Sequence, residues 1–347
     1  FIDDGARRLM ATEVAPGGLT CLWGPPGAGK SRLAAELCAA RRTEWPGGQL
    51  WLDLAADSGG SSLVAALASG LDLPGIGEGD LEGLLSTLPA RLERPTLVVI
   101  DNADRFLTEM AVLARRLLPL ARNLGVLVTS RERVGIGLEQ ARRVRLLDLP
   151  IEGAASVVGA SESLSLLLAG LSRLGFDRQP TREWLALLAA AARAADGLPE
   201  VLLRIAAASG GPMGERNLAD IVDGRLEVLE ESAPIDGLRH RGLMDSVAWN
   251  LDALSLSAQL LFERLALFSG RFAVAEVERL CSGDLGSGIV LEQDVVLEAM
   301  QELEAASLLQ VDGIAKAERH RLLGPLRWVA WRRAERRGEA QALGQVG

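Results

Sequence analysis

Gly24-Pro25-Pro26-Gly27-Ala28-Gly29-Lys30-Ser31 is the stretch of sequence that decides the fold. It follows the apolar run Leu19–Trp23 and opens a helical pattern at Ser31–Ala40, which is the context of a phosphate-binding loop. Glycines let the backbone turn so that successive N–H groups point at phosphate oxygens, and the helix start adds its positive dipole end. The stretch therefore predicts a loop that holds the phosphates of a nucleoside triphosphate.

Lys30 and Ser31 supply the side chains that this chemistry needs. A lysine here places a compact positive charge on the β- and γ-phosphates, and the serine hydroxyl serves Mg²⁺. The chain has only two lysines, Lys30 and Lys316, and uses arginine elsewhere, so composition alone does not explain a lysine at this position. A turn that merely begins a helix is the alternative. We expect the nucleotide to contact the whole motif and Arg32, which follows it.

A second apolar run ends in a carboxylate. Leu97–Ile100 precedes Asp101, which we expect to lie at the sheet edge beside the loop and to hold Mg²⁺ through water. An aspartate that only turns the chain is the alternative. Asn102 stands where many ATPases have an acid that orients the attacking water, and an amide is a poor general base. We therefore expect slow hydrolysis, with Asp104 as a candidate substitute.

A third apolar run ends in an arginine. Val126–Thr129 leads into Ser130 and Arg131, at the same expected edge of the sheet. Arg131 is thus a candidate to reach the γ-phosphate and report its presence, with Arg133 as its neighbouring substitute. A surface arginine at a strand end is the alternative.

The first 150 residues alternate between strand-length apolar runs and helical patterns. This alternation predicts an α/β domain at 1–150 with a parallel sheet covered by helices on both faces. The expected strands are Leu19–Trp23, Leu50–Leu54, Leu97–Ile100, Val126–Thr129 and Val144–Leu147. The expected helices are Ser31–Ala40, Ser62–Gly70, Leu81–Leu92 and Met110–Leu124.

Helical periodicity dominates the rest of the chain. It predicts a helical bundle at 151–232, with helices at Ala160–Leu174, Thr181–Ala195, Glu200–Ala208 and Asn217–Leu229. Within 233–347 we expect a winged-helix domain, with helices at Leu243–Ala248, Ser257–Phe268, Val274–Leu280 and Glu292–Ala306. A hairpin of Leu308–Val311 with His320–Leu323 follows, and the basic helix Pro325–Arg337 is expected to end the folded part.

Composition narrows the function classes. The 347 residues carry a net charge of -9, which argues against neutralising nucleic-acid phosphates over the whole chain. Three widely spaced cysteines fit buried reduced thiols and a cytoplasmic location. The apolar run Trp184–Ala208 is interrupted by charges and does not predict a membrane span. No histidine has a partner at metal-ligand spacing, and the chain, which begins at Phe1 without Met, is interpreted as part of a longer protein.

The order of these motifs resembles the STAND class of signalling NTPases. The phosphate-binding loop, Leu97–Asn102, Thr129–Arg131 and Gly197-Leu198-Pro199 follow one another as in that class. Within it, the chain is similar to the NB-ARC-type ATPase module of bacterial transcriptional regulators of the antibiotic-regulator and LuxR-like type. Four later segments extend the likeness to the winged-helix region: Arg239-His240-Arg241 with Leu243, Ser246–Asn250, Leu261–Gly270, and Arg321–Leu323 through Trp328–Ala330.

The resemblance implies a mechanism that composition does not show. ADP would hold a closed form, and ATP exchange would open it and permit self-association. Pro199 would pack on the adenine, and Arg131 would sense the γ-phosphate. Effector and sensor domains would lie outside this chain. The family's ADP-contacting histidine is replaced here by Leu323, which places the lock in doubt or moves it to His320, and Glu200 replaces the usual apolar residue after Pro199.

Other function classes stay open from sequence alone. A metabolic phosphotransferase or a mechanical ATPase is the main alternative, although no acceptor site or lid is visible. DNA binding through the winged helix is a third reading, supported only by the basic terminal helix and opposed by the acidic balance. ATP is favoured over GTP by the resemblance, not by a base-specific motif.

Overall fold

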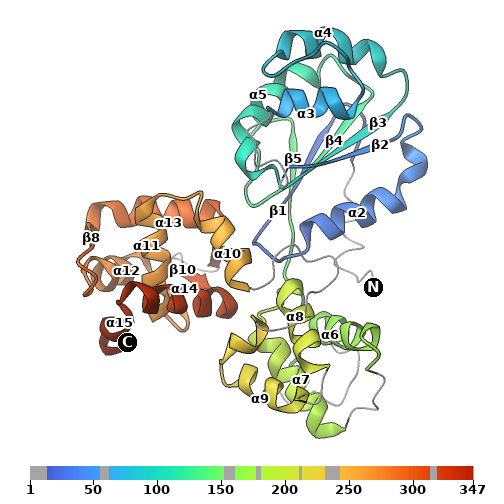
Figure 1. Cartoon of the computed structure of the whole chain (residues 1–347). Coiled ribbons are helices and arrows are strands. Elements are labelled where there is room, and N and C mark those ends of the chain that lie inside the picture. The colour runs from blue at the N-terminus through green and yellow to red at the C-terminus, as the bar shows by residue number, and fades with distance from the viewer. Residues whose placement is uncertain are drawn as a thin grey trace. The chain divides into compact units, whose positions relative to one another are not determined.

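The computed structural model describes residues 14–54, 62–151, 161–176, 181–210, 213–230, 243–312 and 319–346 (Figure 1). The chain divides into two compact units. The first comprises Phe1–Gly24 and Gly29–Arg145, and the second Pro25–Ala28 and Leu146–Gly347. Arg239-His240-Arg241 of the expected winged-helix region lies outside the described residues.

A five-stranded parallel sheet forms the centre of the first unit. Its strands are β1 (Leu19–Trp23), β2 (Gln49–Asp53), β3 (Thr96–Asp101), β4 (Leu124–Ser130) and β5 (Glu139–Arg143). They lie in the order β2-β3-β4-β1-β5, and every neighbouring pair is parallel. Because β4 lies between β1 and β3, its end is flanked by the strand that leads into the loop and the strand that carries Asp101. The predicted parallel α/β sheet is confirmed.

Helices cover both faces of this sheet. They are α2 (Lys30–Ala40), α3 (Leu63–Gly70), α4 (Leu81–Arg91) and α5 (Leu107–Leu117), with single turns η1 (Arg42–Glu44) and η2 (Ala103–Phe106). Val98 and Ile100 pack into one apolar cluster with α3, α4 and α5. Side chains alternate along a strand, so Leu97 and Val99 face the other side, where Figure 1 shows α2. Both faces of β3 and β4 are buried, which explains their continuous apolar runs.

The fifth strand is not where the sequence predicted it. We expected Val144–Leu147, an apolar run, but the strand is Glu139–Arg143. It is the edge strand beside β1, its residues are half-buried or exposed, and it therefore carries no apolar pattern. Val144 follows it and still donates its N–H to Trp23 O (2.8 Å). The apolar signal thus marked the segment after the strand.

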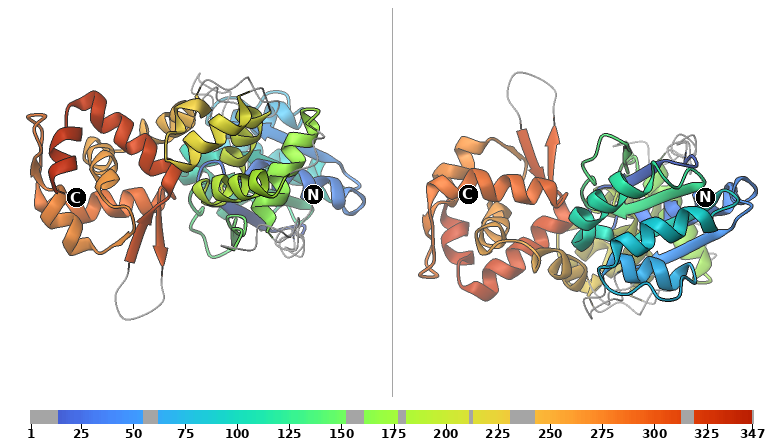
Figure 2. Two further views of the ribbon diagram at one scale, coloured as in Figure 1. Left: turned by 90° about the horizontal axis from the view of Figure 1, so that it is seen from below. Right: turned by 90° about the horizontal axis from the view of Figure 1, so that it is seen from above.

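The second unit is mostly helical in its described residues. Its helices are α6 (Glu162–Arg173), α7 (Arg182–Ala194), α8 (Pro199–Ser209), α9 (Gly214–Val222), α10 (Leu243–Leu251), α11 (Leu256–Arg264), α12 (Val274–Cys281), α13 (Gln293–Ala305), α14 (Gly324–Arg337) and α15 (Ala340–Val346), with turns η3 (Leu226–Leu229) and η4 (Leu265–Leu267). Antiparallel strands β6 (Arg271–Phe272), β10 (Arg319–Leu322) and β9 (Leu309–Asp312) form one sheet, and β7 (Gly283–Asp284) pairs with β8 (Val290–Leu291). The expected hairpin is present as β9 and β10 (Figure 2).

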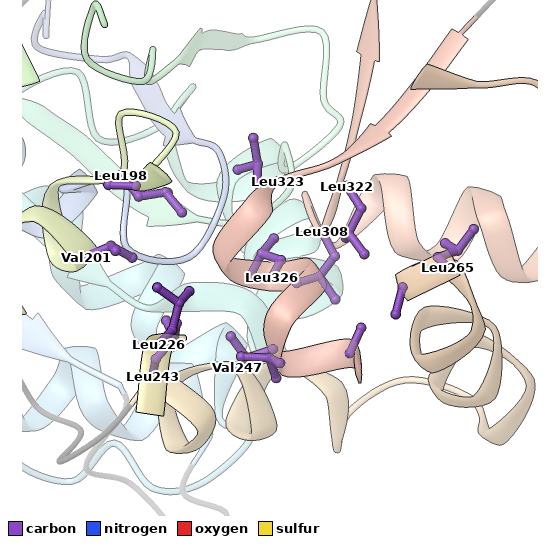
Figure 3. Packing of buried hydrophobic residues seen from close by; sticks show 14 of the residues in the cluster. Leu198, Val201, Leu226, Leu243, Val247, Leu265, Leu308, Leu322, Leu323 and Leu326 are labelled. Carbon is purple, nitrogen blue, oxygen red and sulfur yellow. The ribbon is translucent and has the colours of Figure 1, made fainter. Parts of the chain in front are cut away.

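One apolar cluster runs through the second unit. It includes Leu198 and Val201 at the start of α8, Leu226 in η3, and Leu323 and Leu326 beside and within α14 (Figure 3). A polar contact accompanies this packing. Asp196, whose φ is 50°, accepts hydrogen bonds from Arg321 and from the backbone N–H of Gly324 (2.6 Å). The turn before α8 is thereby fixed to the start of α14.

Two basic residues of α14, Arg333 and Arg337, make internal contacts. Glu263, 1% exposed at its side chain, binds Arg333 Nε (3.1 Å) and Arg337 Nε (2.5 Å). We predicted that this helix ends the folded part, and that was wrong, because α15 follows and Glu339 is fully buried. Glu339 pairs with the equally buried Arg264 (2.7 Å), a partner 75 positions earlier that sequence spacing does not reveal.

Arg264 and Glu339 form a satisfied buried ion pair. Arg264 also donates to the carbonyl oxygens of Cys281, Gly283 and Ile289, which fixes the β7–β8 hairpin. All three cysteines are buried free thiols, and burial raises the pKa of Cys21 and Cys281 to about 12 and that of Cys38 to about 11. Within the described residues, no helix has the length and apolarity needed to cross a membrane.

We expect Glu339→Gln to lower the free energy of unfolding by about 3–5 kcal/mol, because it leaves the buried Arg264 charge unpaired. Denaturant titration of both proteins measures the difference, and Glu298→Gln, at an exposed position on α13, is the matched control. A change as small as that of the control would contradict the structural role of the pair.

The difference in unfolding free energy between wild type and Glu339→Gln should depend on pH. Burial raises the pKa of Glu339, but hydrogen bonds from Arg264 and Ser287 outweigh it, so the net pKa is lowered. Its stabilisation is then complete above the unfolded-state value of about 4.3 and is lost as pH falls through the lower folded-state value. The difference between wild type and Glu339→Gln should therefore shrink in acid.

Candidate functional site

The phosphate-binding loop connects β1 to α2. Gly29, immediately before α2, has a φ of 87°, a left-handed conformation that a side chain would strain. Lys30 folds back over the loop and donates its Nζ to Gly24 O (2.9 Å). Pro25 and Ala28 close a turn within the loop, where Ala28 N–H donates to Pro25 O (3.3 Å). The loop backbone thus turns immediately before α2, and the N–H groups in the first turn of a helix are the kind of donors that bind anions.

Asp101 is the point at which the site's polar side chains meet. Its Oδ1 accepts from Ser31 Oγ (2.7 Å) and from Thr129 Oγ1 (2.5 Å), and the residue is 1% exposed. The three residues come from the start of α2 and the ends of β3 and β4. The structure therefore brings the two predicted magnesium ligands, Ser31 and Asp101, into direct contact.

Oxygen ligands of this kind suit Mg²⁺. In proteins this ion is usually bound by one or two carboxylates and by the phosphates of the substrate. Among the described residues, no group of three or more His, Cys, Asp or Glu side chains is placed to hold a metal. Ser31 and Asp101 would thus share the ion with phosphate oxygens rather than enclose it.

Asn102 follows Asp101 in a left-handed conformation, with φ 61° and ψ 49°. Asparagine tolerates this region better than most residues. Its backbone N–H donates to Thr129 Oγ1 (3.1 Å) and its Nδ2 to Asp53 Oδ1 (3.2 Å) at the end of β2. The residue's backbone shape and amide contact give a structural reason for asparagine at this position.

Arg131 lies one residue beyond β4 and is 7% exposed. Its backbone N–H donates to Asp104 Oδ1 (2.6 Å), and its Nε lies 3.1 Å from the same oxygen. The side chains of Arg131 and Asp104 are only 9% and 15% exposed. The predicted γ-phosphate sensor is therefore held by an internal carboxylate.

The electrostatics of Lys30 reflect these neighbours. The pKa of Lys30 is lowered to about 8, mainly by desolvation; Asp104 and Asp101 oppose this shift, and Arg131 contributes to it. Two cations and two carboxylates thus act on one another at the carboxyl edge of the sheet.

Two further residues, Arg32 and Pro199, were predicted to contact the nucleotide. Arg32 is 73% exposed at its side chain and pairs with Glu36 one turn along α2. Pro199 is the first residue of α8 in the second unit. His320, the proposed substitute lock, is 2% exposed, and its Nε2 lies 2.5 Å from Glu304 Oε1. Its Nδ1 is buried and has no hydrogen-bond partner among the described residues, and its role as a substitute lock stays a prediction.

Sequence reasoning missed two partners of the site. Thr129 was quoted only as part of a motif, although its hydroxyl links Asp101 to Asn102. Asp53 ends β2 and receives the Asn102 amide. Both stand at the carboxyl ends of parallel strands, and that shared position is the signal that identifies them.

Comparison with known proteins agrees with this geometry. Residues 14–136 match the AAA domain family. The loop, the parallel sheet and this match together define an AAA-type P-loop NTPase domain over that part of the chain.

Relatives extend along nearly the whole chain. A Mycobacterium tuberculosis protein named "Putative HTH-type transcriptional regulator" is 29% identical over 334 residues, covering 95% of this chain and 35% of that protein. A second protein of this organism, named only as uncharacterized, is 25% identical over 337 residues, covering 97% and 80%. The chain thus spans about a third of the length of the first relative.

Solved structures give weaker likenesses. A STAND protein with a tetratricopeptide repeat sensor from Pyrococcus horikoshii aligns with a TM-score of 0.37 and 14% identity, over 94% of this chain and 41% of that chain. Cdc6p from Pyrobaculum aerophilum aligns with a TM-score of 0.42 and 11% identity, over 99% and 92%. We draw no conclusion from either at these TM-scores.

The lowered pKa of Lys30 predicts how nucleotide affinity varies with pH. Above pH 8 the empty site holds increasingly neutral lysine, which must take up a proton to bind phosphate. We expect the affinity for ADP to fall by up to about tenfold per pH unit above that value. Fluorescence titration with a labelled ADP between pH 7 and 9.5 measures it. Lys30→Met should bind more weakly and lose most of this dependence; an equal slope in the variant would assign the titration to another group.

Proposed function

We propose that this chain is an ATP- and ADP-dependent switch that controls a larger regulatory protein. Its P-loop domain binds the nucleotide with Mg²⁺ and hydrolyses ATP slowly. The nucleotide state then governs opening and self-association of the chain. The observation that carries the proposal is the Ser31–Asp101–Thr129 contact beside Lys30, because it gathers the groups that triphosphate and magnesium need.

Each side chain has a role in binding. Lys30 would exchange the Gly24 carbonyl for phosphate oxygens, and Ser31 and Asp101 would hold Mg²⁺, which neutralises phosphate charge when bound. Arg131 would contact the γ-phosphate, the part of ATP that ADP lacks. Pro199 would pack on the adenine, as the resemblance implies.

Two observations support slow turnover. Asn102 follows Asp101, and its amide donates to Asp53, so neither its chemistry nor its contact suits a general base. Asp104, the other candidate, accepts the backbone N–H of Arg131 and forms an ion pair with its side chain. A site with a slow chemical step retains its nucleotide state for long enough to act as a switch.

The regulatory part of the proposal rests on relatives. The first mycobacterial relative is named as a transcriptional regulator and is about three times as long as the matched region, which leaves room for effector and sensor domains. We propose three domains here, at 1–150, 151–232 and 233–347, the last a winged helix supported by α11–α13 and the β9–β10 ribbon. Action in the bacterial cytoplasm belongs to the same proposal.

Direct nucleic-acid binding by this chain is not part of the proposal. The basic helix α14 commits Arg333 and Arg337 to the buried Glu263, so these charges serve folding. The net charge of -9 also disfavours binding to the negatively charged phosphates of nucleic acids.

The first test identifies the nucleotide that the purified chain carries. The protein is denatured and the supernatant analysed by anion-exchange chromatography, with Lys30→Ala alongside. We expect close to one ADP per wild-type chain and none in the variant, because the variant lacks the charge that binds phosphate. Circular dichroism of the variant is the folding control.

The opposite result has a clear reading. An empty site that turns over added ATP at tens per second, a rate typical of working enzymes, would contradict the switch. A mechanical ATPase or a phosphotransferase would then be the better account.

A further inference from the structure

Asp104 lies in the candidate site, but the proposed binding of nucleotide and magnesium gives it no role. It lies in the turn η2 after β3, three residues beyond Asp101. Within the described part of the chain, its carboxylate accepts a hydrogen bond from the backbone N–H of Arg131 and forms an ion pair with the side chain of the same residue. Asp104 Oδ1 accepts the backbone N–H of Arg131 and lies 3.1 Å from Nε of its side chain, so one oxygen contacts both the backbone and the side chain of Arg131.

This contact restricts a side chain that is otherwise flexible. An arginine loses much rotamer freedom when its guanidinium is ordered against a ligand. With Nε paired to Asp104, part of this freedom is already lost before any ligand arrives. Partial burial of both side chains protects the pair from solvent competition.

The pair also moderates the charge of the site. Arg131 and Lys30 are close enough that Arg131 lowers the pKa of Lys30, whereas Asp104 raises it. A carboxylate between two cations reduces their repulsion in the empty protein. The arrangement holds Arg131 near a second cation with a carboxylate as its counter-charge.

We propose that Asp104 is a positioning residue that presents Arg131 to the terminal phosphate, and thereby sets how strongly the site prefers a nucleoside triphosphate over a diphosphate. This inference rests on the proposed function. It differs from a general-base role because Asp104 would act through Arg131, which it holds at Oδ1, rather than by accepting a proton from water.

The test compares three substitutions by competition against a fluorescent ADP, using a non-hydrolysable ATP analogue and ADP as ligands. Asp104→Ala should weaken analogue binding about tenfold, the scale of ordering one rotamer-rich side chain, and leave ADP binding within about twofold. Asp104→Asn should restore the preference in part, because its amide oxygen still accepts the backbone N–H of Arg131 but no longer forms the ion pair with Nε. Arg131→Lys, which keeps the charge but lacks Nε, should resemble Asp104→Ala and serves as a second route if the alanine variant does not fold.

A double-mutant cycle decides whether Asp104 acts through Arg131. In an Arg131→Ala background, Asp104→Ala should change the analogue-to-ADP ratio no further. Equal losses for both nucleotides, an unchanged ratio, or loss of hydrolysis with unchanged binding would each overturn the inference. A wild-type chain that binds neither nucleotide would remove the proposed function itself, whereas normal wild-type binding with an unaltered ratio removes only this inference.

Discussion

The buried carboxylate of Asp101 is the constraint on which the rest of the site depends. It lies at the end of a strand buried on both faces and binds hydroxyl groups from the neighbouring strand and from the first turn of α2. A carboxylate with so little exposure needs such donors, because an unsatisfied buried charge is costly. The order β3-β4-β1 supplies them from adjacent strand ends. The sheet topology therefore determines the chemistry of the site, since Asp101 receives Thr129 from the adjacent strand and Ser31 from the end of the loop.

The positions of most strands of the sheet were predictable because strands buried on both faces consist of continuous apolar residues. β1, β3 and β4 fall close to their expected positions for that reason. The position of the edge strand β5 was predicted wrongly. Glu139–Arg143 pairs with one strand only and has polar side chains, so it lacks the apolar run on which the prediction depended. In the second unit, helical spacing located α6–α8 and α11–α14 within a few residues. Short elements such as β7 and β8 depend on Arg264 reaching their carbonyl groups, a contact between distant positions that no local pattern contains.

The candidate site divides in a similar way. Lys30, Ser31 and Asp101 were predictable because phosphate and magnesium chemistry fixes their spacing relative to a strand and a helix. The partners that orient them were not, since Thr129, Asp53 and Asp104 act through contacts between strand ends. Asp104 illustrates the limit: as a sequence position it suggested a base, and as a structure it holds an arginine.

The contact between Asp196 and the start of α14 introduces ionic strength as a variable for the second unit. Arg321 is 39% exposed at its side chain, so dissolved ions reach one partner of this pair, while the surrounding leucines are shielded from them. Apolar packing between the turn before α8 and α14 changes little with moderate salt, whereas this charged contact weakens. Two forces thus hold the same junction, and at moderate concentrations dissolved ions weaken the charged contact much more than the apolar packing.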